Sequence, residues 1–407
     1  MAKKNIQDER LIEDEKAMQS LLNAMTKMKK AEMRKSLEFV ELEEFEEIDE
    51  KEMEAYEKDM DATMFEELMS KEGFYTEEEY RDAIGKWLEH VSLSDFIAEI
   101  EKRVIGQENL KKVCYNIYHY LELIATGSEK NLPFLIAAPS GCGKSETYRA
   151  VKDYFRKKMK FLYIEFVDCS ALTEAGFKGN DPSSVVGGLL DKPNSNGIGI
   201  VFLDEVDKKV VPSYTTGGTN VNAAVQHGLL TIMEGCPVRA KGTSRAIDTS
   251  NTLFVAMGAF DFLRNEKEEE KTISFGEQKE KREHYDDVTR EELLEAGALN
   301  EFVGRLSSIV NYHKLTEEAV RNIINLNISE MEKEFHLSIQ ADKNVYEEMY
   351  EIANGKFGCR TIKNILRDRV QALDMATKLA GKPHGPLLIR LNEDGDTCED
   401  KTAELLF

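Results

Sequence analysis

The sequence predicts an α/β protein in which a mostly parallel sheet is flanked by helices and followed by a smaller, mainly helical domain. Four apolar runs with β-strand character alternate with helical stretches, at residues 134–137, 161–167, 198–203 and 252–256. A glycine-rich loop follows the first run, and two carboxylates end the third. Such alternation is typical of parallel sheets covered by helices.

Length, composition and charge narrow the class of protein. The 407 residues suffice for two or three domains, with 41% hydrophobic and 32% charged residues. We find no apolar run of about 18 residues that could span a membrane and no secretory signal, so we expect a cytoplasmic protein. The net charge of −22 makes nucleic acid an unlikely main partner, because binding to phosphate backbones depends on Lys and Arg.

The cysteines indicate neither a zinc site nor a disulfide framework. They are scattered, with no Cys-x-x-Cys pair and no histidine at metal-ligand spacing. Their positions are 114, 142, 169, 236, 359 and 398.

Residues 1–92 form a compositional unit that we expect to be an acidic helical accessory region. Residues 41–70 contain 14 acidic residues against two lysines. An apolar helix face is predicted by the spacing of Met18, Leu21, Leu22, Met25 and Met28. A partly disordered acidic arm, or a tail that only keeps the protein soluble, is the alternative. Trp87, the only tryptophan, is expected to pack rather than to recognise a ligand.

We expect three domain boundaries along the chain. Ser92 is placed to cap a helix with the apolar residues Leu93, Phe96, Ile97 and Ile100 on one side, so we set a domain boundary there. Residues 93–314 are then the large α/β domain, and residues 315–393 a small helical domain with one late strand at 386–391. Residues 394–407 are expected to form a loose polar tail.

The loop from Ala138 to Ser145 has the pattern of a phosphate-binding loop. It lies between a predicted strand and a predicted helix, where its glycines let backbone N–H groups surround a triphosphate. Lys144 is expected to contact the β- and γ-phosphates of ATP, and Ser145 to bind Mg²⁺. Ala138 replaces the usual first glycine. The expected nucleotide contacts are Pro139, Ser140, Gly141, Cys142, Gly143, Lys144, Ser145 and Glu146.

Two carboxylates end the apolar run at 198–203. A buried strand tolerates charges only where its tip meets a cation or water. We therefore expect Asp204 to bind Mg²⁺ and Glu205 to act as the general base that polarises the attacking water.

Several other motifs occur in a fixed order: Val104-Ile-Gly-Gln107, Leu172 to Gly179, Asp248-Thr-Ser, Gly258-Ala-Phe260, Glu301 to Leu306 and Gly358-Cys-Arg360. With them, residues 93 to 392 resemble the ClpX-type AAA+ unfoldases of the Clp family, with HslU more distant. The resemblance implies a P-loop AAA+ large domain and a small lid domain.

The resemblance also implies roles that the residue patterns do not show. Val104 and Ile105 match the segment that packs against the adenine. Arg305 matches the arginine finger, which reaches the γ-phosphate bound to a neighbouring subunit and acts with Lys144 and Glu205 in catalysis. Arg360 matches the arginine of the small domain that reads the nucleotide.

The segment Gly176-Phe177-Lys178-Gly179 matches the loop whose aromatic residue grips a threaded polypeptide. Glycines on both sides leave the ring of Phe177 little local packing. Phe177 stands in place of tyrosine and Lys178 in place of an apolar residue, so grip and substrate preference are open. Residues 212–220 correspond to a second axial loop.

Two departures from the ClpX pattern concern partners. The chain has no cysteine before Cys114, so the four-cysteine zinc domain of ClpX is not matched. The tripeptide Ile273-Ser-Phe275 stands where ClpX has the Ile-Gly-Phe that docks on its peptidase, after a strongly charged run. Docking of a ClpP-type peptidase is left open.

The resemblance therefore implies a chaperone that assembles into a homo-oligomer, with six subunits expected, and threads polypeptide substrates through a pore using ATP and Mg²⁺. Two alternatives are kept. One is a remodeller of a specific complex that works without a peptidase, and the other a scaffold whose assembly is gated by ATP.

Overall fold

The structure is a computed structural model of the whole chain. It describes residues 61–128, 132–173, 180–191, 193–239, 246–264, 287–355, 358–381, 387–392 and 395–400. The chain divides into two compact units, Met1–Phe65 and Glu66–Phe407.

A five-stranded sheet is the centre of the larger part of this unit. Its strands lie in the order β2-β3-β6-β1-β7, and each neighbouring pair is parallel. The predicted mostly parallel sheet is confirmed. The strands are β1 (Phe134–Ala137), β2 (Tyr163–Asp168), β3 (Gly199–Asp204), β6 (Thr252–Gly258) and β7 (Ile309–Asn311).

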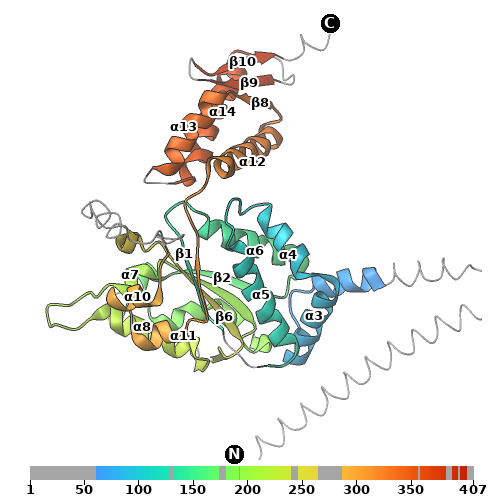
Figure 1. Cartoon of the computed structure of the whole chain (residues 1–407). Helices are drawn as coiled ribbons and strands as arrows, with labels where there is room; N and C mark the ends of the chain where they lie inside the picture. The colour runs from blue at the N-terminus through green and yellow to red at the C-terminus, as the bar shows by residue number, and fades with distance from the viewer. Residues whose placement is uncertain are drawn as a thin grey trace, which may run out of the picture. The chain divides into compact units, whose positions relative to one another are not determined.

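Helices cover both faces of the sheet (Figure 1). One group is α3 (Glu77–His90), α4 (Leu93–Glu101), α5 (Leu110–Ala125) and α6 (Lys144–Lys158). The other is α7 (Asp207–Val210), α8 (Val221–Met233), α10 (Arg290–Glu295) and α11 (Asn300–Arg305). Short 3₁₀ helices lie at Cys169–Ala171, Pro182–Val186, Gly188–Asp191 and Pro193–Ser195, and β4 (Pro237–Val238) pairs with β5 (Ile247–Asp248).

Burial on both faces explains why the strands read as continuous apolar runs. All residues of β1 and β6 are buried. On one face Leu135, Val201 and Phe254 pack in a cluster with residues of α8 and α11. On the other, Phe202 of β3 contacts Tyr148 of α6, with ring centroids 5.4 Å apart. Strands that are buried on both faces are mostly apolar, and their polar residues occur mainly at the strand ends.

Residues 66–91 belong to the sheet-containing unit, which begins at Glu66 rather than at Leu93. Ser92 does cap α4, as predicted, through a capping box with Asp95. Helix α3, however, packs against α5. Its Trp87 is fully buried, with its ring centroid 5.7 Å from that of Phe155 and 6.1 Å from that of Phe96. The expectation that Trp87 packs is confirmed. The predicted helix at 18–28 lies outside the described residues.

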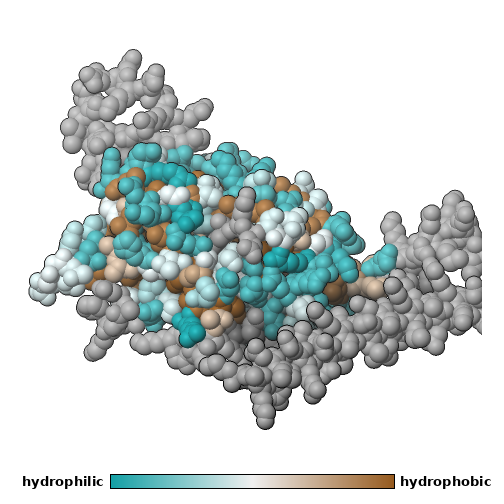
Figure 2. Space-filling model, turned by 90° about the horizontal axis from the view of Figure 1, so that it is seen from below, coloured by the Kyte–Doolittle hydropathy of each residue, from teal (hydrophilic) through white to brown (hydrophobic). Residues whose placement is uncertain are grey.

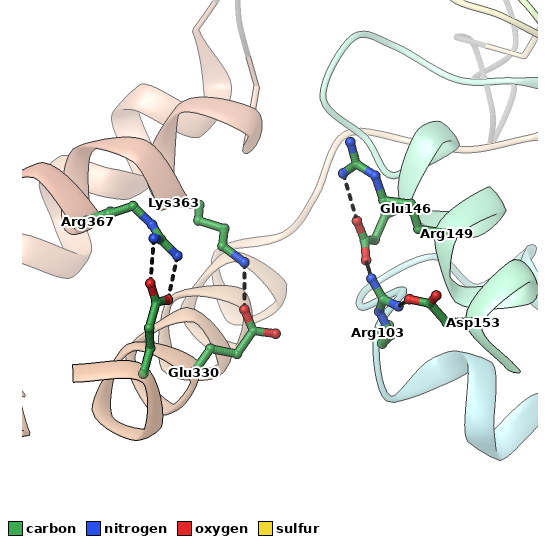
Figure 3. Close-up of polar contacts among 8 residues, drawn as sticks. Arg103, Glu146, Arg149, Asp153, Glu330, Lys363 and Arg367 are labelled. Atoms are coloured by element: carbon green, nitrogen blue, oxygen red, sulfur yellow. Dashed lines mark hydrogen bonds and ion pairs between the residues drawn. The ribbon is translucent and has the colours of Figure 1, made fainter. Parts of the chain in front are cut away.

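The C-terminal part has its own apolar cluster, formed by α12 (Glu317–Phe335), α13 (Lys343–Asn354), α14 (Arg360–Leu379) and a three-stranded sheet. Ion pairs join α12 to α14 on the outside of this cluster (Figure 3). Lys363 contacts Glu330 at 2.6 Å, and Arg367 contacts both carboxylate oxygens of Glu334 at 2.7 and 2.8 Å. The predicted mainly helical region after residue 315 is confirmed.

The polar tail expected at residues 394–407 is wrong for part of its length. The strand predicted at 386–391 is β9 (Leu387–Leu391), and it pairs with β8 (Ser338–Ala341) and with β10 (Thr397–Asp400). Cys398 packs on the apolar cluster, and Glu399 lies 3.4 Å from Arg390 across the strand pair. These cross-strand contacts hold a polar strand that its own composition does not predict.

On the face shown in Figure 2, hydrophobic residues occur in several groups separated by hydrophilic ones. The most exposed large hydrophobic residues of the described chain are Tyr75, Leu379, Tyr214 and Met375, at 86%, 80%, 68% and 60%. Among the described residues, no helix combines the length and apolarity that crossing a membrane requires.

Trp87→Ala is expected to destabilise the sheet-containing unit by about 3–5 kcal/mol, because it leaves a cavity among aromatic side chains. Trp87 is the only tryptophan, so unfolding in urea should be followed by circular dichroism. Tyr75→Ala is the control, since an exposed ring contributes within about 0.5 kcal/mol. Equal midpoints for the two variants would contradict the assignment of α3 to this core.

Candidate nucleotide site at the carboxyl edge of the sheet

The sheet brings the predicted phosphate loop and the predicted carboxylates to one edge. The loop follows β1, Asp204 ends β3, and β6 lies between these two strands. Parallel strands present their carboxyl ends at the same edge of a sheet. Ala138, which begins the loop, and Asp204 therefore lie at one edge although they are 66 positions apart in the sequence.

The loop turns through two glycines in the left-handed region, Gly141 at φ 76° and Gly143 at φ 101°. Gly143 is the N-cap of α6, and no side chain caps this helix end. The first N–H groups of α6 and its dipole therefore face the loop, the arrangement in which a helix binds phosphate. This geometry suits phosphate binding, and the nucleotide contacts expected for residues 139–145 stay a prediction.

Lys144 is folded onto the loop that precedes it. Its Nζ donates to the carbonyl oxygens of Ala138 at 2.5 Å and Pro139 at 3.3 Å. Burial lowers the pKa of Lys144, while the carboxylates of Asp204 and Asp207 oppose that shift. The ammonium thus lies within the electrostatic reach of the carboxylates at the end of β3.

Glu205 has an unusual backbone conformation for a residue with a side chain, at φ 57°. Left-handed conformations cost a non-glycine residue roughly 1–3 kcal/mol and cluster at functional sites. The Glu205 N–H donates to Asp204 Oδ1 at 2.9 Å, and the Glu205 carboxylate pairs with Lys208. Burial raises the pKa of Asp204, partly offset by this N–H and by Lys144. The turn thus directs two successive carboxylates out of a buried strand.

Asp207 ties this turn to the end of β6. Its Oδ2 accepts from the Phe260 N–H at 3.3 Å, and burial raises its pKa. The Val206 N–H donates to the Met257 carbonyl at 3.0 Å. On the other side of β6, the Ala138 N–H donates to the Gly258 carbonyl at 3.1 Å. Strand β6 therefore fixes the spacing between the phosphate loop and the carboxylates.

The segment 104–107 lies against the loop from the side of α4. Val104 is 3% exposed, and a Cβ on Gly143 would lie 3.7 Å from its Cγ1. Gln107 Nε2 donates to the carbonyls of Cys142 at 3.0 Å and His313 at 2.9 Å, and its Oε1 accepts from the His313 N–H at 3.1 Å. One buried amide thus joins the phosphate loop to the segment that leads into α12.

Of the other nucleotide contacts expected, Ile105 packs against the C-terminal apolar cluster. Arg360 is the first residue of α14 and is exposed. Two residues earlier, a Cβ on Gly358 would lie 2.6 Å from the Ser140 carbonyl oxygen, so only glycine fits against the loop. The carboxylate of Glu146 contacts arginines, at 2.5 Å from Arg103 and 3.3 Å from Arg149.

Arg305 ends α11 and does not approach the loop of its own chain through any contact described here. Its guanidinium pairs with Glu234 at 2.5 Å, directly after α8, and the two side chains are 44% and 43% exposed. The predicted arginine finger is therefore on the surface and paired within its own chain.

The predicted pore residues Phe177 and Lys178 lie outside the described residues, as do Ile273 and Phe275. The two ends of the pore segment are joined, since the Thr173 N–H donates to the Asn180 carbonyl at 2.9 Å. The predicted second axial loop is a short hairpin in which Tyr214 pairs with Asn220 and remains exposed.

Sequence reasoning assigned no role to three residues beside the loop. Gln107 was noted only as part of a motif. Asp261 accepts from Ser140 Oγ at 3.5 Å. Arg264 is 8% exposed and donates to the Ala259 carbonyl. Burial raises the pKa of the Cys142 thiol, and the charge of Arg264 is among those that oppose this shift. For Asp261 and Arg264, the one signal in the sequence is that they are charged residues in an otherwise apolar stretch after β6.

Comparison with known proteins agrees with this geometry. The family model for the AAA domain (Cdc48 subfamily) matches residues 129–309. The chain is 29% identical over 258 residues to ATP-dependent Clp protease ATP-binding subunit ClpX 2 of Wolinella succinogenes, covering 59% of this chain and 61% of that protein. ClpX of Treponema denticola is 29% identical over 278 residues, covering 60% and 65%. The match thus spans less than two thirds of each relative.

Gln107→Ala is expected to weaken nucleotide binding about tenfold, because it leaves the Cys142 and His313 carbonyls without their buried donor. Titration with a fluorescent ATP analogue measures the effect. Asn109→Ala is the matched control, since Asn109 donates only to the Asn311 carbonyl in the same region, at 2.7 Å. Equal losses in both variants would show that Gln107 acts on the fold and not on the loop.

Proposed function

We propose that this chain is a ClpX-like AAA+ ATPase that hydrolyses Mg-ATP between the subunits of a homo-oligomeric ring, expected to be a hexamer, and uses the energy to unfold or remodel polypeptides. The observation that carries the proposal is the meeting of the phosphate loop with Asp204 and Glu205 at one sheet edge, across β6.

Each group of the site has one role in the proposed hydrolysis of ATP. The loop N–H groups and Lys144 would bind the phosphates, and Ser145 and Asp204 would hold Mg²⁺, whose charge would offset that of the phosphate oxygens. Glu205 accepts a hydrogen bond from the attacking water and orients it. The left-handed backbone of Glu205 supports this role, because it turns the carboxylate away from the buried strand.

The role proposed for Arg305 needs a second subunit. Its side chain is 44% exposed, at the end of α11. An arginine that reaches the γ-phosphate of a neighbour stabilises the charge of the transition state. A site completed in this way couples hydrolysis to assembly.

The threading step is assigned to Phe177 and Lys178 on the pore loop, with residues 212–220 as a second loop. Exposure of Tyr214 at 68% supports an axial surface that contacts polypeptide. The relatives are described as subunits of an ATP-dependent Clp protease, and a ClpP-type peptidase is therefore the first partner to test.

A remodeller that works without a peptidase is the second candidate. It is favoured by Ser274 within the docking tripeptide, which departs from the ClpX pattern. Here the acidic segment upstream of Glu66 selects the complex to be remodelled. A scaffold gated by ATP is less favoured, because it does not require Glu205 and Arg305 together.

Glu205→Gln is expected to bind ATP normally and to lower kcat roughly a hundredfold or more, and Arg305→Ala to lower it about a thousandfold. Mixing the two inactive variants tests the subunit interface. A subunit with Arg305→Ala retains Glu205 and receives Arg305 from its neighbour, so mixed rings should recover hydrolysis. No recovery in rings shown to contain both variants would refute action between subunits.

Phe177→Ala is expected to abolish ATP-dependent unfolding of a tagged fluorescent protein, while the rate of ATP hydrolysis stays within about twofold, because the ring contacts substrate and not nucleotide. Tyr115→Ala, an exposed aromatic on α5, is the control. Unfolding at the wild-type rate by Phe177→Ala would remove Phe177 from the mechanism. Degradation of the same substrate only when ClpP is added would count against the remodeller.

A further inference from the structure

Arg103 is at the centre of a charge cluster beside the nucleotide site (Figure 3). Its two terminal nitrogens bind different carboxylates of α6. The Nη2 atom lies 2.5 Å from Glu146 Oε1, and the Nη1 atom lies 2.6 Å from Asp153 Oδ2. The other oxygen of Glu146 contacts Arg149 at 3.3 Å. The guanidinium fork thus spans two turns of the helix that begins in the phosphate loop.

The position of Arg103 in the chain gives this contact its significance. It directly precedes Val104 and Ile105, the segment expected to pack against the adenine. Glu146 directly follows Ser145 and lies two positions after Lys144. The cluster therefore joins the segment expected to hold the base to the helix expected to hold the phosphates, through side chains that are 33–40% exposed.

Whereas Arg103 contacts α6, Gln107 contacts the phosphate loop itself, through the Cys142 carbonyl. Arg103 and Gln107 thus anchor both ends of residues 104–106. Between these anchors, Gly106 has φ 77° and packs so closely on α12 that a Cβ would lie 2.4 Å from the Ala319 Cβ. The segment is held on both sides and has little freedom of its own.

Arg103 also balances charge. Glu146 lies in the first turn of α6, where its negative charge opposes the binding of a triphosphate at the same helix end. Burial lowers the pKa of Arg103, but Asp153 and Glu146 outweigh this and raise it, so the guanidinium stays charged. Its charge offsets that of Glu146.

We propose that Arg103 is a positioning residue for the nucleotide, which sets the base-binding segment at a fixed distance from the phosphate loop and thereby determines how strongly this ATPase prefers adenine. The inference rests on the proposed function. A bidentate arginine is required, because lysine offers one point charge and cannot span two carboxylates with fixed geometry.

The test compares Arg103→Ala with Arg149→Ala in the full-length protein. Arg149 contacts Glu146 but not Asp153 and is 63% exposed, so its loss removes a charge of the same sign without releasing the segment. Kd values for fluorescent ATP and GTP analogues and KM and kcat for both nucleotides are measured. Melting temperature without nucleotide reports on the fold.

Arg103→Ala should raise the KM for ATP about tenfold, keep kcat within about twofold and reduce the preference for ATP over GTP severalfold. Arg149→Ala should keep wild-type preference. Arg103→Lys should resemble Arg103→Ala in base preference. Should Arg103→Ala melt below the wild type, Arg103→Lys and Asp153→Asn decide the question by the same readouts.

Wild-type base preference in Arg103→Ala, or in Arg103→Lys and Asp153→Asn where these decide, would overturn the inference. An equal loss of preference in Arg149→Ala would do so as well, because net charge alone would then explain the effect. A wild-type protein that binds neither nucleotide would instead refute the proposed function, so the two failures are distinguishable.

Discussion

The hydrogen bonds of β6 to the elements on both of its sides are the constraint on which the candidate site depends. Through Gly258 the strand holds the start of the phosphate loop, and through Met257 it holds Val206, in the turn that carries Glu205 and Asp207. These backbone contacts leave the spacing between loop and carboxylates independent of any flexible side chain. A site preorganised by a buried sheet needs little rearrangement when charge develops during a reaction.

The electrostatics of the site follow from the same burial. Asp204, Asp207 and Asp261 act on Lys144, and desolvation raises the pKa of Asp204 and Asp207. One ammonium therefore faces more negative charge than it can balance, before any phosphate is bound. The Mg²⁺ proposed to bind at Asp204 and Ser145 would offset this excess, and carboxylates are ligands that Mg²⁺ prefers.

Much of the fold and of the site followed from the sequence because the determining signals were local. Apolar runs predicted the first and last residues of β1, β2, β3 and β6 to within two positions. Glycine spacing predicted the turns of the phosphate loop. Strand β7 has three residues, and β10 is polar and depends on β9, so neither has a local pattern. The bridge from Gln107 to His313 crosses 206 positions, a pairing that only the folded chain reveals. The packing partners of Trp87 are likewise revealed only by the folded chain, since they come from α4, α5 and α6.

The ion pair between Arg305 and Glu234 has a consequence for the energetics of assembly. Both side chains are more than 40% exposed, and pairs of this kind typically contribute only about 0.2–1 kcal/mol. Exchanging the carboxylate of Glu234 for an anion on a neighbouring chain therefore costs little and is easily reversed. The guanidinium keeps a partner in either state, so neither state leaves the charge exposed to unrelated anions. In the proposed ring, such an exchange would let contacts between subunits form and break at little cost in free energy.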